Sequence, residues 1–318
     1  MSVWSIPKRK SYRPNFIYMA VAGFVLFAGV FCVHLFGAGD LAPISQTAFP
    51  AVYSKLAATG LTTVDFFDVG QGSAALISFP DGKSLMVDSG PPSNRDKLLS
   101  YLDERDVDVV DCFVITHQHG DHAGNVDAVL KEFSVKDIVF PVVPVNLLID
   151  PARFEGIYKD IADHGLVIHN PYKGEVILSG DGYAVTVLSD DTGIYKTLND
   201  YSIILRVVVG DVSFLLMGDA EAATEQQLLH SGDNLHSNVL LVGHHGNRNA
   251  DSIPFLTAVS PDTAVISVGD NDFGQPSKAV INRLSENSIA VYRTDICGTV
   301  TIETDGQTIS VNSDSNQQ

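Results

Sequence analysis

Short apolar runs recur along most of the chain, and polar or glycine-containing turns separate them. Runs of this kind, rich in valine, isoleucine, leucine and phenylalanine, are typical of buried β-strands. We therefore expect two β-rich halves. The pattern predicts strands at residues 62–67, 74–78, 84–87, 112–115, 137–140, 184–188, 202–208, 213–217, 239–242, 264–267 and 300–303.

Longer segments between these runs carry apolar residues at helical spacing. In each segment the apolar residues cover one face, as expected of a helix that packs on a sheet. The alternation of such helices with strands indicates a mixed α/β fold. The predicted helices cover residues 95–102, 123–133, 153–164, 222–230 and 277–285.

The most hydrophobic segment lies near the N-terminus. Residues 16–39 contain no Asp, Glu, Lys or Arg, and as a helix they could cross about 30 Å of hydrocarbon. A cleaved signal peptide is the alternative, but its apolar core would normally span only about 7 to 15 residues. The basic residues at positions 8–13 and Asp40 after the span favour a cytoplasmic N-terminus. We expect a single-pass membrane protein whose main domain is extracytoplasmic.

These patterns divide the chain into five parts. Prolines and glycines after the apolar span are typical of a linker, and the polar C-terminal residues are typical of a disordered tail. The predicted parts are a basic cytoplasmic tail (1–15), a transmembrane anchor (16–39), a linker (40–60), the main domain (61–312) and a disordered tail (313–318).

One predicted strand ends in a cluster of metal-binding side chains. His117, His119, Asp121 and His122 follow the apolar run 112–115. In an extended segment the first two histidines project to the same side and can share one ion, whereas a turn at the intervening glycine lets the other two face a second ion. Imidazole and carboxylate ligands suit Zn²⁺ or Mn²⁺. The cluster predicts two divalent metal ions.

Further candidate ligands follow later strands. Asp219 comes after the run 213–217 and is a candidate bridge between the two ions, although alone it could equally cap a helix. His244 and His245 follow the run 239–242 and are flanked by glycines, which allow close approach to a ligand. We favour His244 as the metal ligand and His245 as a supporting or substrate-contacting residue, but the sequence leaves the choice open.

Taken together, these motifs resemble the metallo-β-lactamase superfamily and, within it, the hydrolase domain of ComEC-type DNA-internalisation competence proteins. The resemblance covers roughly residues 60–312. It rests on motifs in a fixed order, namely Asp68-Val69-Gly70-Gln71-Gly72, Val87-Asp88-Ser89-Gly90, the His117–His122 cluster, Asn199-Asp200-Tyr201-Ser202, Met217-Gly218-Asp219-Ala220-Glu221, Gly243-His244-His245-Gly246 and Arg293-Thr294-Asp295.

The resemblance implies an αββα sandwich that holds two divalent ions at one edge and hydrolyses its substrate with a metal-activated water. It further implies that Asp219 bridges the ions and that Asp88 orients a ligand histidine. Our assignment is metal binding by His117, His119, Asp121, His122, Asp219 and His244, catalysis by Asp121, His245 and Asn199, support of the ligands by Asp68 and Asp88, and substrate contacts from Ser202, Arg248 and Gln275.

Two of these assignments carry alternatives. Asn199 and Ser202 precede an apolar run, so they can contact substrate or complete a coordination shell, or they can merely cap a strand. Gln275 stands where similar sequences typically carry a histidine. Glutamine can hydrogen-bond to a phosphate but cannot act as a general acid near neutral pH, so protonation of a leaving group from this position is not expected.

Composition limits the substrate. The 318 residues are 45% hydrophobic and 18% charged, which indicates a globular chain with one sizeable domain. A formal net charge of -18 argues against a strong groove for duplex DNA, because Lys and Arg contacts to phosphate dominate that affinity. A single-stranded polynucleotide is still compatible, since two cations in the site would neutralise local phosphate charge.

The expected function is therefore that of a membrane-anchored extracytoplasmic metallohydrolase, a phosphodiesterase or nuclease linked to DNA uptake as a component of an uptake channel. The substrate would be single-stranded DNA or another phosphodiester. Because a fold does not fix a substrate, two alternatives stay open. One is a hydrolase of small esters, lactams or lactones, and the other is a metal-binding assembly component without turnover.

Overall fold

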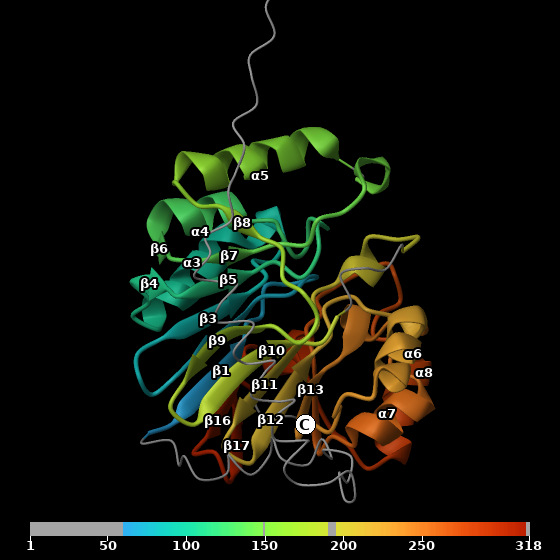
Figure 1. Cartoon of the computed structure of the whole chain (residues 1–318). Helices are drawn as coiled ribbons and strands as arrows, with labels where there is room; N and C mark the ends of the chain where they lie inside the picture. Colours follow the sequence, from blue (N-terminus) through green and yellow to red (C-terminus); the bar gives the residue numbers. More distant parts are fainter. Residues whose placement is uncertain (1–59, 149, 190–194, 316–318) are drawn as a thin grey trace, which may run out of the picture. The chain divides into compact units, whose positions relative to one another are not determined.

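The main domain consists of two large β-sheets packed face to face, with helices on both outer faces (Figure 1). The computed structural model describes residues 60–148, 150–189 and 195–315. Within these residues no helix combines the length and the apolar character needed to cross a bilayer. The predicted tail, anchor and most of the linker lie outside the described residues.

The first sheet begins as an antiparallel meander and continues with parallel strands. The meander is formed by β1 (Thr62–Phe66), β2 (Ala75–Ser78) and β3 (Ser84–Val87). β3 then pairs parallel with β5 (Cys112–Val114), and the chain between these two strands contains the crossover helix α3 (Arg95–Glu104). The strand order is β17-β16-β1-β2-β3-β5-β7-β8, in which the other strands are β7 (Ile138–Val139), β8 (Ile168–His169), β16 (Val300–Thr304) and β17 (Ile309–Ser313).

The second sheet has the same two-part organisation. Its first four strands are antiparallel neighbours, and the last three join in parallel through helices. The order is β15-β14-β13-β12-β11-β10-β9, formed by β9 (Val176–Gly180), β10 (Tyr183–Val187), β11 (Leu205–Val209), β12 (Val212–Leu216), β13 (Val239–Leu241), β14 (Thr263–Ile266) and β15 (Ala290–Arg293). A small separate sheet pairs β4 (Val109–Val110) with β6 (Ser134–Val135).

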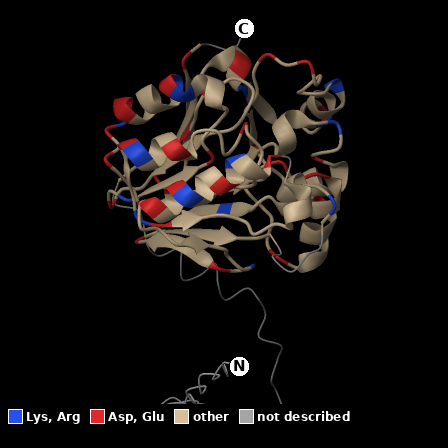
Figure 2. Ribbon diagram, turned by 90° about the horizontal axis from the view of Figure 1, so that it is seen from above, with Lys and Arg blue, Asp and Glu red and all other residues tan. Residues whose placement is uncertain are grey.

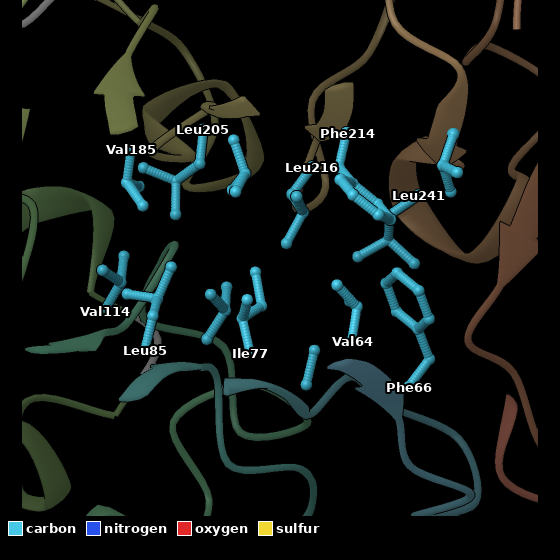
Figure 3. Close-up of a cluster of buried hydrophobic side chains, with 14 of the residues drawn as sticks. Val64, Phe66, Ile77, Leu85, Val114, Val185, Leu205, Phe214, Leu216 and Leu241 are labelled. Atoms are coloured by element: carbon cyan, nitrogen blue, oxygen red, sulfur yellow. The ribbon is translucent and has the colours of Figure 1, made fainter. Parts of the chain in front are cut away.

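The main hydrophobic core lies between the two sheets (Figure 3). Alternate residues of each strand point inward, as the period of a β-strand requires. The labelled side chains of this core come from the first sheet (Val64, Phe66, Ile77, Leu85 and Val114) and from the second (Val185, Leu205, Phe214, Leu216 and Leu241).

Each outer sheet face packs on its own set of helices. The first sheet is covered by α3, α4 (Val126–Glu132) and α5 (Pro151–Asp163) (Figure 1). The second sheet is covered by α6 (Ala222–Ser231), α7 (Ile253–Val259) and α8 (Lys278–Glu286). The predicted αββα arrangement of the mixed α/β fold is thereby confirmed. Short elements complete the fold: η2 (Pro92–Asn94), η3 (Val145–Leu147), η4 (Asn199–Tyr201), η5 (Gly243–Gly246) and α9 (Thr294–Cys297).

The structure extends the predicted elements in several places. The unexpected elements are β4, β6, β8, β9, β15, β17, α7 and α9. α4 begins at Val126 rather than at 123 because residues 120–125 form the turn that follows the histidine cluster. β17 runs to Ser313, and the backbone amides of Asp314 and Ser315 donate to the carbonyls of Thr299 and Cys297. The folded domain therefore ends later than the expected boundary at 312.

Candidate metal centre

The candidate ligands meet at one edge of the sandwich, where both sheets contribute strand ends. The loop 116–122 follows β5 of the first sheet, whereas Asp219 follows β12 and His245 follows β13 of the second. The backbone amide of Ile203 donates to the carbonyl of Thr116 over 2.8 Å, so the two sheets are hydrogen-bonded directly at the site. Because the strands on each side run parallel, their carboxyl ends deliver these loops to the same edge.

Asp219 lies at the centre of the cluster, with 1% of its surface exposed. Its Oδ1 atom is 3.0 Å from Nε2 of His122 and 3.6 Å from Nε2 of His245. Its Oδ2 atom is 3.6 Å from Nε2 of both His117 and His244. The carboxylate therefore lies between two sets of imidazoles, which is the position a bridging ligand requires.

The donor atoms fit divalent cations. Two sets have ligand atoms that all lie within 4.8 Å of one another, and the buried Oδ1 of Asp219 accepts no well-aligned hydrogen bond among the described residues, although Nε2 of His122 lies 3.0 Å from it. A buried carboxylate oxygen without a partner is costly, and a bound cation would remove that cost. The two sets are His117, His122 and Asp219, and Asp121, His122 and His245.

His119 lies next to the first set. Its Nδ1 atom is 3.0 Å from Nε2 of His117, so the structure brings the two histidines of the His-x-His pair together. Burial lowers the pKa of His117 well below its usual value, which keeps this imidazole neutral. A neutral ring is the form that can donate a lone pair to a metal.

The geometry distinguishes His245 from His244. Nδ1 of His245 is 2.7 Å from the carbonyl oxygen of Ser267, so it donates there and leaves Nε2 facing Asp121 at 3.3 Å. This is the usual way in which a protein orients a ligand histidine. Nδ1 of His244 instead contacts Glu221 at 2.7 Å. Both rings are therefore oriented through Nδ1, and they differ in what Nε2 faces. Nε2 of His245 belongs to the second set, for which the sequence had favoured His244, whereas Nε2 of His244 lies 3.6 Å from Oδ2 of Asp219.

Both histidines have positive φ angles, 47° for His244 and 53° for His245. Non-glycine residues seldom adopt this conformation, and they retain it at sites where the surroundings enforce it. Here the amide of His244 donates to the carbonyl of Gly218 over 3.0 Å, which ties the loop to the turn that carries Asp219. The strained turn thus fixes the two rings relative to the carboxylate.

Asp88 lies where it can orient His122. Its Oδ2 atom is 2.7 Å from Nδ1 of His122, and its Oδ1 atom accepts from the backbone amide of Thr116 at 2.7 Å. Burial by itself opposes a charged imidazole, but Asp219 and Asp88 outweigh it and raise the pKa of His122 well above its usual value. A cation bound at Nε2 would displace this proton.

We expect Asp88→Asn to weaken metal binding by about 10- to 100-fold. The amide can no longer hold His122 in the tautomer that leaves Nε2 free, because its nitrogen donates where the carboxylate accepted. Titration of the metal-free protein by calorimetry measures the change. The matched control is Asp103→Asn on the exposed side of α3, and an equal affinity for both variants would contradict the assignment.

Two predicted residues lie away from the ligand cluster. Oδ1 of Asp68 accepts from the amide of Gly70, and its Oδ2 atom is 2.6 Å from Nζ of Lys97, so within the described residues it shapes a turn and forms no hydrogen bond with a ligand histidine. Arg248 is exposed two residues beyond Gly246.

Three other predicted residues line or support the cluster. Ser202 is fully buried, and its hydroxyl accepts from the amide of Asp219 at 3.0 Å, so it positions the central carboxylate rather than reaching a substrate. The side-chain amide of Asn199 contacts the ring of His244 at 3.2 Å, and its buried Oδ1 atom has no hydrogen-bond partner within the described part of the chain. Gln275 accepts a 2.8 Å hydrogen bond from Gln71.

Sequence reasoning missed several residues that orient the ligands. The hydroxyl of Thr116 contacts Asp88 at 2.9 Å, and Glu221 contacts His244. Gln71 connects the first motif to the loop of Gln275. All three lie inside or beside the motifs that carried the resemblance. Their position in these motifs was the sequence feature that could have identified them as supporting residues.

The sandwich and the paired histidine–aspartate sets at its edge define a metallohydrolase fold with a site for divalent metals. In agreement, the family model described as Metallo-beta-lactamase superfamily matches residues 67–270, and the chain belongs to this superfamily. The predicted resemblance is confirmed.

Curated relatives support the ComEC-type resemblance. The chain is 29% identical over 267 residues to ComE operon protein 3 of Bacillus subtilis, covering 78% of this chain and 34% of the relative. It is 31% identical over 247 residues to Recombination protein 2 of Haemophilus influenzae (75% and 28%), and 30% identical over 243 residues to Competence protein ComA of Neisseria gonorrhoeae (74% and 31%). The chain thus spans about a third of the length of these relatives.

A solved structure shows the same fold. CmlA, a diiron β-hydroxylase from Streptomyces venezuelae, superposes with a TM-score of 0.53 at 15% identity, covering 76% of this chain and 54% of that chain. That protein is described as a hydroxylase and not as a hydrolase. The likeness therefore concerns the fold, and the reaction of this chain has to be argued from its own site.

Proposed function

We propose that this chain is a metal-dependent phosphodiesterase that acts as a nuclease on single-stranded DNA. The observation that carries the proposal is the central position of Asp219, whose two oxygens face different sets of imidazoles. A carboxylate shared in this way is suited to two cations close together. Two-metal sites of that kind are typical of enzymes that cleave phosphodiesters.

The residues divide between two cations in this proposal. His117, His119 and Oδ2 of Asp219 would hold the first, and Asp121, His122, His245 and Oδ1 of Asp219 would hold the second. When bound, the cations would supply the charge that activates a water molecule and neutralises phosphoryl oxygens. Either Zn²⁺ or Mn²⁺ matches these nitrogen and oxygen donors.

The remaining site residues act on substrate and on the ligands. Asn199 lies beside His244 at the rim of the first set, where its side chain can contact a substrate or complete the shell of the first cation. The buried Asp88 and Ser202 hold His122 and Asp219 in place.

The charge of the protein favours a single strand over a duplex. The formal net charge is -18, and Figure 2 shows acidic and basic residues interspersed along the helices of the face it presents. Duplex binding depends on many Lys and Arg contacts to phosphate. Cleavage of a strand that reaches the site by other contacts is therefore the reaction we propose, with a role in DNA uptake suggested by the names of the relatives.

The direct test is cleavage of a labelled single-stranded oligonucleotide by the full-length chain purified in detergent. We expect cleavage with Mn²⁺ or Zn²⁺, none with chelator, and weaker cleavage of the matching duplex. The proposal would be wrong if the folded protein binds two metals and cleaves no phosphodiester. In that case lactone and β-lactam substrates would test the other hydrolase class, and inactivity on all of them would favour an assembly component.

The membrane topology is a second part of the proposal. We propose that residues 16–39 anchor the chain with its N-terminus in the cytoplasm and its metal centre outside, on the strength of the uncharged apolar run and the basic residues before it. Protease added to intact spheroplasts should digest the main domain and spare an N-terminal tag. Protection of the main domain until the cells are lysed would refute this topology.

A further inference from the structure

The loop 269–277 is held rigidly by one of its own side chains. Nδ2 of Asn271 donates to the carbonyls of Gly269 and Gln275, each over 2.8 Å. Its Oδ1 atom accepts from the backbone amides of Phe273 and Gln275, each over 3.1 Å. Four bonds to one amide fix the loop, so the side chains that it carries are presented in a defined position.

This loop packs against the second metal set. The amide of Ser277 donates to the carbonyl of Gly246 over 2.9 Å, directly after His245. A Cβ atom on Gly246 would come within 2.6 Å of Pro276, so the two segments touch. The loop is therefore a wall of the site on the side of His245.

A second contact ties the loop to the histidine cluster through the first motif. Gly269 packs on the backbone of Gln71, where an added Cβ would lie 2.3 Å from the amide nitrogen. The next residue, Gly72, lies against Asp121, and an added Cβ there would come within 2.4 Å of the Asp121 carbonyl. Gln71 thus stands between Asp121 and the loop that carries Gln275.

The hydrogen bonds of Gln71 fix which atom of Gln275 is free. The backbone amide of Gly269 can only donate, and it donates to Oε1 of Gln71 over 3.2 Å. Nε2 of Gln71 must then donate to Oε1 of Gln275, over 2.8 Å. Nε2 of Gln275 is left with two hydrogens for another partner. Gln275 therefore offers a substrate only a donor, which suits an anionic oxygen.

The same loop exposes an aromatic ring. Phe273 is 78% exposed, whereas the phenylalanines of the core are almost fully buried. Two residues span at most about 7 Å, so the Cα atoms of Phe273 and Gln275 lie within about 7 Å of each other. Exposed aromatic rings on rigid supports are what single-stranded nucleic acids stack on.

We propose that the loop 269–277 binds a nucleotide next to the metal centre, with the ring of Phe273 stacked on a base and Nε2 of Gln275 donating to a phosphoryl oxygen. Gln71 is the positioning residue that holds the glutamine in its donor orientation. The inference rests on the proposed nuclease function and adds a contact to it. Stacking itself needs no positive charge, so it is a contact that a chain of net charge -18 can offer to a single strand.

The stacking contact is tested with strands that have or lack bases. For a labelled single-stranded oligonucleotide, we expect Phe273→Ala to raise KM by about 5- to 150-fold, the range that corresponds to one stacked base. Phe273→Tyr should restore a KM near that of wild type. On an abasic strand of the same length, the Ala variant and wild type should have similar KM values, because no base is present to stack.

Equal KM values of wild type and Phe273→Ala on the base-containing strand would overturn the stacking contact even if both cleave it. Binding measured by fluorescence anisotropy separates this result from failure of the proposed function. If nothing is cleaved but binding still depends on Phe273 and on the bases, the nuclease function fails and the nucleotide site stands. If binding is the same for wild type and Phe273→Ala and the same with and without bases, the proposed nucleotide site is wrong.

The donor orientation of Gln275 is tested through Gln71→Glu. An ionised glutamate accepts from Gly269 but cannot donate to Gln275, so the free donor is lost and KM rises. Near neutral pH, where the imidazole ligands can bind metal, this glutamate is ionised, so KM of the variant should exceed that of wild type while kcat changes little.

The control for that experiment is Gln226→Glu, which places the same new carboxyl on the exposed side of α6. Its KM and kcat should both match those of wild type. If Gln71→Glu also leaves KM unchanged, Gln71 does not set the orientation of Gln275, and this part of the proposal is wrong.

Discussion

Asp219→Asn should remove most bound metal and lower phosphodiester cleavage by roughly 1,000-fold, since a loss of several kcal/mol of stabilisation corresponds to this change in rate. The carboxylate faces His122 and His245 with one oxygen and His117 with the other, so one substitution weakens both proposed cation positions. Metal content by atomic emission and single-turnover cleavage of a labelled strand measure the two effects.

The matched control is Asp262→Asn. Asp262 is exposed and precedes β14, at the opposite end of that strand from the site. We expect full metal content and unchanged cleavage in this variant. If Asp219→Asn retains two metals and its rate, the central carboxylate does not bridge cations and the proposed function loses its main support.

The largest effect on stability is expected from Phe214→Ala in β12. Phe214 is 1% exposed in the core between the sheets (Figure 3), and truncation of such a ring to alanine costs about 3 to 5 kcal/mol. For a domain of this size the melting temperature should fall by on the order of 10 °C. Scanning calorimetry of the full-length chain measures the shift.

Phe273→Ala provides the matched comparison for this substitution, because it makes the same chemical change on the surface. With 78% of Phe273 exposed, its free energy of unfolding should change by no more than about 0.5 kcal/mol. Similar melting temperatures for the two variants would show that Phe214 is not part of a close-packed core.

The strand ends of the ligand cluster were predictable from local patterns. The run before His117 and the run before Asp219 each show a buried strand that stops at a polar residue, and the structure places both residues at the shared sheet edge. The apolar period determines which segments are buried, and the carboxyl ends of parallel strands converge. Local sequence therefore located most of the site.

The supporting contacts were not predictable from local patterns, because they join residues that only the fold brings together; Asp88 was assigned its orienting role through the family resemblance alone. Asp88 and His122 lie 34 positions apart, and Gln71 and Gln275 lie 204 apart. The choice between His244 and His245 depends on two left-handed backbone angles and on which ring nitrogen meets the carbonyl of Ser267. No period in the sequence encodes these features.

The unexpected elements have a similar explanation. β9 and β17 are edge strands with many half-exposed or exposed residues, so their hydrophobic signal is weak. α7 has only seven residues, too few for a clear helical period. The missed strands thus have a small share in the core, whereas α7 buries three core residues and was missed because it is short.

The donors of the candidate centre belong to opposite sheets, His117 and Asp121 to the first and Asp219 and His245 to the second. A cation bound between them would crosslink the two sheets at this edge of the sandwich. Its binding would raise the free energy of unfolding by an amount that grows with the logarithm of the free metal concentration. The stability of the domain would then depend on the metal concentration of its compartment. Where that concentration is low, the domain would melt at a lower temperature and be digested more readily by proteases.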